Sequence, residues 1–272
     1  MKRIVIWMTA LLLIAGSWGG NVWYYNSMQL AEPMFLPHFI AIHGMGGEPI
    51  DFYYLENQAD AGEVVGIQIE ELPPLRFNLH ESSRYSHHVL MKASAYWEPE
   101  MLGAPDQSQL PMTIREITVH YNGRAPKRVP IGEVLLMPDR REGLLNFIMG
   151  GASSDGTGNS KVRLTRQATL EKVDYAYSDR IGPGFRLELD GQPIEEQSFP
   201  RELREGDLLE FTYAWLAQEN ERIVLEGYQI KVQLHFRTPE GRTTVETIPV
   251  NRNVYLSEAQ VKRLVRAGGE LP

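Results

Sequence analysis

The chain has 272 residues, of which 43% are hydrophobic and 23% are charged, so its composition is that of a globular protein and not of a disordered one. The net charge of -8 is spread along the chain without a basic stripe, which argues against nucleic acid as a partner. The absence of cysteine excludes disulfides, thiolate metal sites and a cysteine nucleophile.

The first thirty residues have the layout of an export signal. Lys2 and Arg3 precede an uncharged, mostly apolar run over residues 4–20, and the first acidic residue of the chain is Glu32. A membrane-spanning helix needs about 20 residues, and residues 4–23 reach that length. The basic start predicts a cytoplasmic N-terminus and an extracytoplasmic body, held in the cell membrane by a single span.

Aromatic residues mark the outer end of this run, where amphipathic rings favour the membrane–water interface. The predicted membrane-anchor residues are therefore Lys2, Arg3, Trp18, Trp23, Tyr24 and Tyr25. A second interpretation is a cleaved signal peptide, because small residues precede a cleavage position near Ser17. In that case the protein is secreted.

From residue 31 onward the pattern is mostly β. Short segments rich in β-branched and aromatic residues are bounded by Gly, Pro, Asn or Asp, which is typical of strands. These segments are 39–43, 64–70, 89–97, 114–121, 134–137, 162–164, 169–177, 185–189, 208–215, 229–237 and 243–250. Over residues 230–236 apolar and polar residues alternate, which predicts one buried face and one solvated face.

The length after the N-terminal segment suits two domains, since domains commonly have about 100 to 150 residues. Residues 150–160 are all small or polar and are predicted to be a linker or exposed loop, with a short helix over 141–149 before it. The predicted organisation is a signal anchor or transmembrane helix at 1–30, a β-rich domain at 31–149 and a second β-rich domain at 161–272. Both domains have the size of β-sandwiches of the immunoglobulin-like kind.

A short helix is predicted to close the chain. Ser257 and Gln260 form a capping-box pattern ahead of an amphipathic segment, and Gly268 with Gly269 can end the helix.

An apolar strand runs into His43-Gly44-Met45-Gly46-Gly47, which resembles the oxyanion-hole loop of α/β-hydrolases. That fold also needs a serine on a Gly-x-Ser-x-Gly elbow. The most similar segment, around Ser153, lacks the closing glycine and a preceding strand. A glycine-rich strand-end turn is the simpler interpretation. A secreted or surface hydrolase or carbohydrate-active enzyme that uses the His43 loop stays open as an alternative function.

Two polar clusters have residue types that can bind metal ions. Asp155, Thr157 and Asn159 alternate like the ligands of a calcium loop, but the loop has an arginine where an EF-hand needs a glutamate. His87 and His88 are adjacent, so on a strand they point to opposite faces and are expected at a solvated strand start. No metal or cofactor is predicted, and an ion or ligand sensor is a further alternative.

The leading prediction is a non-enzymatic, membrane-anchored extracytoplasmic binding or scaffold protein. It combines an anchor with β-rich domains that carry no recognisable catalytic set. Its expected partners are the membrane and a protein of a membrane or cell-envelope assembly.

Overall fold

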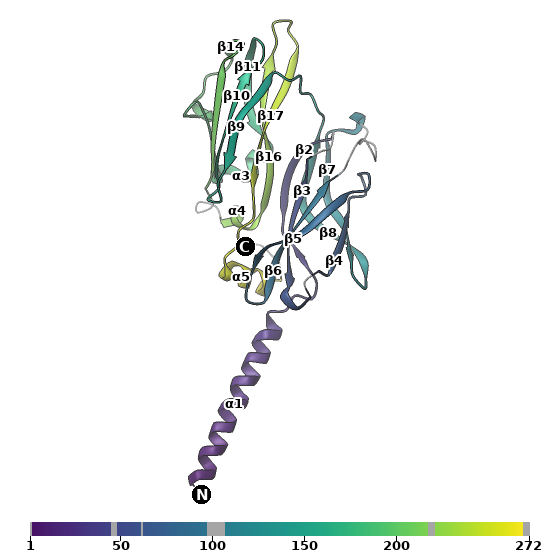
Figure 1. Ribbon diagram of the computed structural model, residues 1–272, viewed down its shortest axis with the longest axis vertical. Coiled ribbons are helices and arrows are strands. Elements are labelled where there is room, and N and C mark those ends of the chain that lie inside the picture. Colours follow the sequence, from purple (N-terminus) through teal and green to yellow (C-terminus); the bar gives the residue numbers. More distant parts are fainter. Residues whose placement is uncertain (1, 45–47, 61, 97–106, 217–220, 269–272) are drawn as a thin grey trace.

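The computed structural model describes the chain except residues 1, 45–47, 61, 97–106, 217–220 and 269–272. The fold is mostly β, with a helix at the N-terminal end and a short helix at the C-terminal end. Helix α1 (Lys2–Ser27) projects from one end of an elongated β body (Figure 1). Its sequence holds no proline, which would interrupt a helix.

The first β-unit consists of two sheet layers around one core. A four-stranded sheet of order β1-β3-β6-β5 packs against strands β2, β8, β7 and β4, and Ile42, Phe52 and Val134 lie in the core between them. The elements are β1 (Met34–Phe35), β2 (His38–His43), β3 (Ile50–Asn57), η1 (Gln58–Asp60), β4 (Val64–Gln68), β5 (Arg76–Arg84), β6 (His88–Tyr96), η2 (Gln107–Gln109), β7 (Met112–Tyr121) and β8 (Arg124–Met137).

The second β-unit repeats this two-layer arrangement. A five-stranded sheet of order β13-β12-β15-β10-β9 packs against β14, β11, β16 and β17, with Leu187, Phe211 and Ile230 in its core. The elements are β9 (Leu145–Ala152), β10 (Thr157–Leu164), β11 (Ala168–Tyr175), α3 (Ser178–Ile181), η3 (Gly182–Gly184), β12 (Phe185–Leu189), β13 (Gln192–Pro193), η4 (Ile194–Glu196), β14 (Arg201–Leu203), β15 (Leu208–Trp215), α4 (Glu221–Leu225), β16 (Gly227–Arg237) and β17 (Thr243–Arg252).

Strand β2 joins the two units. It pairs in parallel with β16 on one side and with β8 on the other, inside one sheet of order β14-β11-β16-β2-β8-β7-β4. Phe39 lies in the core of the second unit, whereas Ile40 and Ile42 lie in the core of the first. Successive side chains of a strand point to opposite faces, so the covering layers of the two units lie on opposite faces of the shared sheet.

The prediction of a linker or exposed loop at 150–160 is wrong about the backbone, because this segment is a β-hairpin, although most of its residues are exposed. Strands β9 and β10 pair antiparallel, and the Ser153 amide donates to the Thr157 carbonyl at 2.8 Å to close the turn. Gly156 takes a φ of 89°, which favours glycine. Small residues leave little side chain to pack, but the backbone of Gly150, Gly151 and Ala152 still pairs with β10.

The helix predicted over 141–149 is also wrong, because Leu145 begins β9. The buried Glu246 carboxylate accepts hydrogen bonds from the amides of Glu142 and Leu144, at 3.0 and 2.9 Å. These two contacts come from β17, about one hundred residues later, and they satisfy amides in a non-helical backbone.

The C-terminal helix is confirmed as α5 (Glu258–Arg266), and its capping box is formed by Ser257 and Gln260 as predicted. Gly268 follows with a φ of 64°, while Gly269 lies outside the described residues. The apolar side of α5 packs in a third cluster with Met28, at the end of α1, and with Leu36. The buried residues on that side are Val261, Leu264 and Val265.

Candidate functional site

Helix α1 carries its apolar side chains on the surface of the molecule. Trp18 and Trp23 are both 72% exposed, and Tyr25 is exposed as well. Lys2 and Arg3 lie in the first turn of α1, but their side chains are outside the described part of the structure. Within the described residues, no helix combines the length and the apolarity of a membrane-spanning helix.

The last turns of α1 are seated on the β body. The rings of Tyr24 and Tyr25 each meet the His87 ring edge-on at 5.7 Å, and Tyr24 also packs against the third cluster. The Nε2 atom of His88 lies 2.7 Å from the Met28 carbonyl oxygen. These contacts fix where the helix leaves the body.

The expectation of a solvated His88 is wrong, because this side chain is buried beneath the end of α1. Burial lowers the pKa of His88, against the opposing effect of its hydrogen bond with the Met28 backbone. His88 and His87 have well-separated rings, with centroids 6.4 Å apart. The two histidines therefore hold the end of α1 against the β body.

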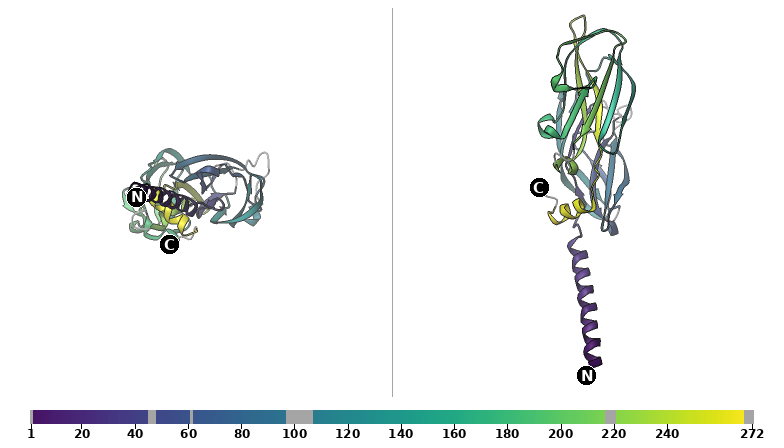
Figure 2. Two further views of the ribbon diagram at one scale, coloured as in Figure 1. Left: turned by 90° about the horizontal axis from the view of Figure 1, so that it is seen from below. Right: turned by 90° about the vertical axis from the view of Figure 1, so that its left-hand side faces the viewer.

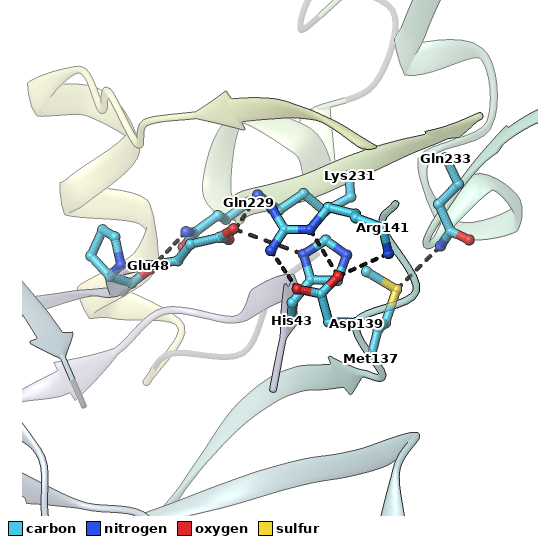
Figure 3. Close-up of polar contacts among 9 residues, drawn as sticks. His43, Glu48, Met137, Asp139, Arg141, Gln229, Lys231 and Gln233 are labelled. Carbon is cyan, nitrogen blue, oxygen red and sulfur yellow. Dashed lines mark hydrogen bonds and ion pairs between the residues drawn. The ribbon is translucent and has the colours of Figure 1, made fainter. Parts of the chain in front are cut away.

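His43 ends β2 at the junction between the two β-units (Figure 3). Its side chain is buried, and its Nδ1 atom lies 3.8 Å from Glu48 Oε1. The other carboxylate oxygen of Glu48 lies 2.7 Å from the Lys231 ammonium. The strand-end histidine thus belongs to a three-residue network with Glu48 and Lys231, in which Glu48 and Lys231 form an ion pair.

The predicted solvated face of β16 is wrong at Lys231, which is 5% exposed. Gln229, on the same face, is also buried and donates to the Pro49 carbonyl at 2.6 Å. Burial alone would raise the pKa of Glu48, but the neighbouring His43 and Lys231 lower it to about 2. Glu48 and Pro49, which precede β3, therefore contact this face, and Glu48 brings a carboxylate to the buried ammonium.

A second ion pair lies beside His43 in the same close-up (Figure 3). The Arg141 guanidinium donates two hydrogen bonds to the Asp139 carboxylate, at 2.8 and 2.5 Å. These bonds lower the pKa of Asp139 to about 2, against the opposing effect of burial. With its neighbours ion-paired, His43 is surrounded by fixed charges, which is typical of a structural network.

The loop that would form an oxyanion hole cannot be compared with a hydrolase, because Met45, Gly46 and Gly47 lie outside the described residues. Ser153 lies elsewhere, in the turn between β9 and β10. The contacts recorded for His43 in the described chain are with the junction network and not with Ser153.

A further buried carboxylate, Glu226, lies at the other end of β2 and has no signal in the sequence. Arg180 donates to it at 2.5 Å, and the Tyr228 hydroxyl donates to its second oxygen. The Arg180 guanidinium also stacks over the Phe39 ring, 3.8 Å from its centroid. Residues of the second unit therefore hold both ends of the strand that the units share.

The β9–β10 hairpin borders an open groove of about 570 Å³ on the outer face of the five-stranded sheet. Small side chains on neighbouring strands leave this face hollow. The groove is lined by Gly151, Ala152, Ser153, Thr157, Gly158, Asn159, Arg186, Glu188, Thr212, Tyr213 and Ala214.

The alternation of Asp155 and Thr157 serves the hairpin turn. The Thr157 amide and hydroxyl both donate to Asp155 Oδ1, at 2.9 and 2.7 Å. These hydrogen bonds lower the pKa of Asp155. In the described chain, no three His, Asp or Glu side chains are grouped so that they could hold a metal ion.

Comparison with known proteins gives no family. No family model matches the chain, and no curated protein matches it. Among solved structures, 28 chains match. One is a protein of unknown function from Porphyromonas gingivalis W83, which aligns over 81% of this chain and 99% of its own with 10% sequence identity and a TM-score of 0.24. A similarity at that TM-score carries no argument about function.

Proposed function

We propose that this protein is a membrane-anchored extracytoplasmic binding or scaffold protein, in which α1 is the anchor and the β body carries the binding surface. The observation that supports this most is the exposure of the apolar side chains of α1. Its side chains Trp7, Leu13 and Trp18 are 75%, 70% and 72% exposed on a helix that projects away from the body (Figure 2). Water is a poor solvent for such a surface, whereas a bilayer is a good one.

The orientation in this proposal follows from charge. Lys2 and Arg3 precede the apolar run, so the N-terminus stays in the cytoplasm and the body is extracytoplasmic. The two β-units then form tandem β-sandwiches of an immunoglobulin-like kind on the outer side of the membrane.

The anchor is tested by placing charges in the middle of α1. We expect L12K/L13K to move the full-length chain from the membrane fraction to the soluble fraction, because a lysine near the bilayer centre costs about 3 kcal/mol. The matched control is V65K, at a position of β4 that is 50% exposed on the body. A parent chain found in the soluble fraction with its N-terminus intact by mass spectrometry would contradict the proposal.

The binding surface in this proposal is the edge strand β9. Within the described residues it is the end of its sheet and pairs with β10 alone. It carries no charged residue, and Phe147, Ile148 and Met149 are 58%, 42% and 55% exposed. An uncharged, exposed edge strand is a template on which another chain can add a strand.

Two other edge strands, β5 and β17, carry features that oppose such pairing. β5 holds Arg76, Glu81 and Arg84, and β17 holds Pro249, which lacks an amide hydrogen. Strands of the second unit run along the long axis, as α1 does (Figure 1). Antiparallel pairing of two β9 strands would reverse one copy and point its α1 away from a shared membrane. The proposed partner is therefore an extended, uncharged segment of another protein.

This surface is tested by cross-linking, since the chain has no native cysteine. M149C is labelled with a photoactivatable cross-linker in native membranes. It is expected to give one discrete cross-linked species, in which mass spectrometry places the cross-link within a single peptide of the partner. V65C is the matched control on β4 and is expected to give none. Equal cross-linking at both positions would show that β9 is not the binding surface.

A further inference from the structure

Helix α5 is fixed beside the exit point of α1. Its buried residues pack in the cluster that holds Met28, the residue after α1. The Glu258 carboxylate accepts from the Ser86 amide at 3.1 Å, and Tyr85 donates to the Leu256 carbonyl at 3.0 Å. Figure 2 shows α5 lying across the end of the body from which α1 projects.

The side of α5 that faces away from the body is basic. Ala259, Arg263 and Arg266 are exposed and are spaced so that they share one face of the helix. Lys262 is half-buried at its flank and pairs with Glu258 at 3.4 Å. The exposed stripe therefore consists of two arginines and a small residue, and the acidic side chain of the helix is held by the body.

We infer that this stripe binds the anionic phosphate headgroups of the membrane that holds α1, an inference that rests on the proposed anchor. The argument is charge complementarity at the place where the bilayer begins. The attraction of arginine to an anionic surface acts within about 8 Å at physiological salt. The chain as a whole has a net charge of -8, so the attraction to an anionic surface comes from this local stripe and not from the net charge of the protein.

The consequence is a preferred orientation of the β body relative to the membrane. With α5 against the headgroups, the long axis of the body stands on the membrane and β9 is held at a fixed height above it. Tyr255, which is 51% exposed just before α5, adds an aromatic ring suited to the interface.

The test uses the full-length protein in nanodiscs of phosphatidylcholine, with or without an equal part of phosphatidylglycerol. A267C, at the end of α5, carries a fluorophore, and a small fraction of lipid carries a headgroup quencher. We expect stronger quenching in phosphatidylglycerol discs. The contacting population should fall about five-fold for each arginine neutralised in R263Q and R266Q, and further in the charge reversals R263E and R266E. High salt should weaken the quenching too.

Two controls separate the possible failures. E240C, in the turn between β16 and β17, should stay unquenched, and R204E, beside β14, should leave the A267C signal unchanged. If R263E/R266E lowers the thermal midpoint, R263Q/R266Q replaces it. Equal quenching in both lipids, or quenching that the arginine variants leave unchanged, would overturn the inference. A chain that does not enter the discs at all would instead overturn the anchor.

Discussion

The two ends of strand β2 each carry a buried histidine, and they are held in opposite ways. His38 lies between Gly132 of β8 and Gly227 of β16, and its Nε2 accepts from the Tyr53 amide at 2.6 Å. His43 lies among charged side chains of the junction network. One end is therefore fixed by close backbone approach, and the other by electrostatics.

The difference also appears in the titration of the two ends. Burial lowers the pKa of His38 to about 3, despite backbone hydrogen bonds that favour the charged form, so this imidazole is neutral in the folded protein. At the other end it is Glu48 whose pKa is lowered, to about 2, and which stays charged. The two histidines of β2 thus have different roles, which depend on the residues around each of them.

The largest effect is expected at the close-packed end. G132A should cost at least about 3 kcal/mol or prevent folding, because this glycine has a φ of 90° and an added Cβ would lie 2.4 Å from the His38 carbonyl oxygen. G123A is the control, with a φ of 72° in open space, and should cost about 1 kcal/mol. Urea unfolding measures both. Equal losses would mean that the close approach to His38 does not matter.

A smaller loss is expected at the charged end. E48Q should cost about 2 to 3 kcal/mol, because the Lys231 ammonium is buried and loses its charged partner. The control E70Q removes an ion pair with Arg128 whose side chains are 52% and 64% exposed, and should cost about 0.5 kcal/mol or less. Unfolding free energies that match for the two variants would contradict the network.

A third prediction separates the two ends by pH. A lowered folded-state pKa gives stability that is present above the unfolded-state pKa and is lost as the pH falls toward the folded-state pKa. Stability should therefore fall from about pH 6.5 because of His38, and fall further from about pH 4.5 because of Glu48. In E48Q the first loss should stay and the second should become shallower. An unchanged acid profile in E48Q would assign the second loss to other carboxylates.

Several elements could be predicted from local sequence. The α5 capping box, the turn at Asp190-Gly191 and strands such as β12 and β15 depend on residues within a few positions of one another. In each case the residue pattern and the backbone geometry have the same local cause.

Strand β3 was missed because it does not alternate. Phe52 and Tyr54 face the first core, while Tyr53 and Leu55 face the third cluster at the base of the body. A strand buried on both faces has no period of two in its hydrophobicity. The second burying layer comes from α1 and α5, at the two ends of the chain, and no local window contains it.

The sequence by itself determined the strand-rich composition, the apolar N-terminal helix and the capped C-terminal helix, because period, charge order and capping residues act over short distances. Only the tertiary structure decided that β2 is shared by both units, that residues 150–160 form a hairpin and that Lys231 is buried against Glu48. The sharing of β2 and the burial of Lys231 depend on contacts between segments more than one hundred residues apart, as between His38 and Gly227. The hairpin is local, but its second strand is held by pairing with β15, about fifty residues later. The same long-range packing places the arginines of α5 beside the exit of α1.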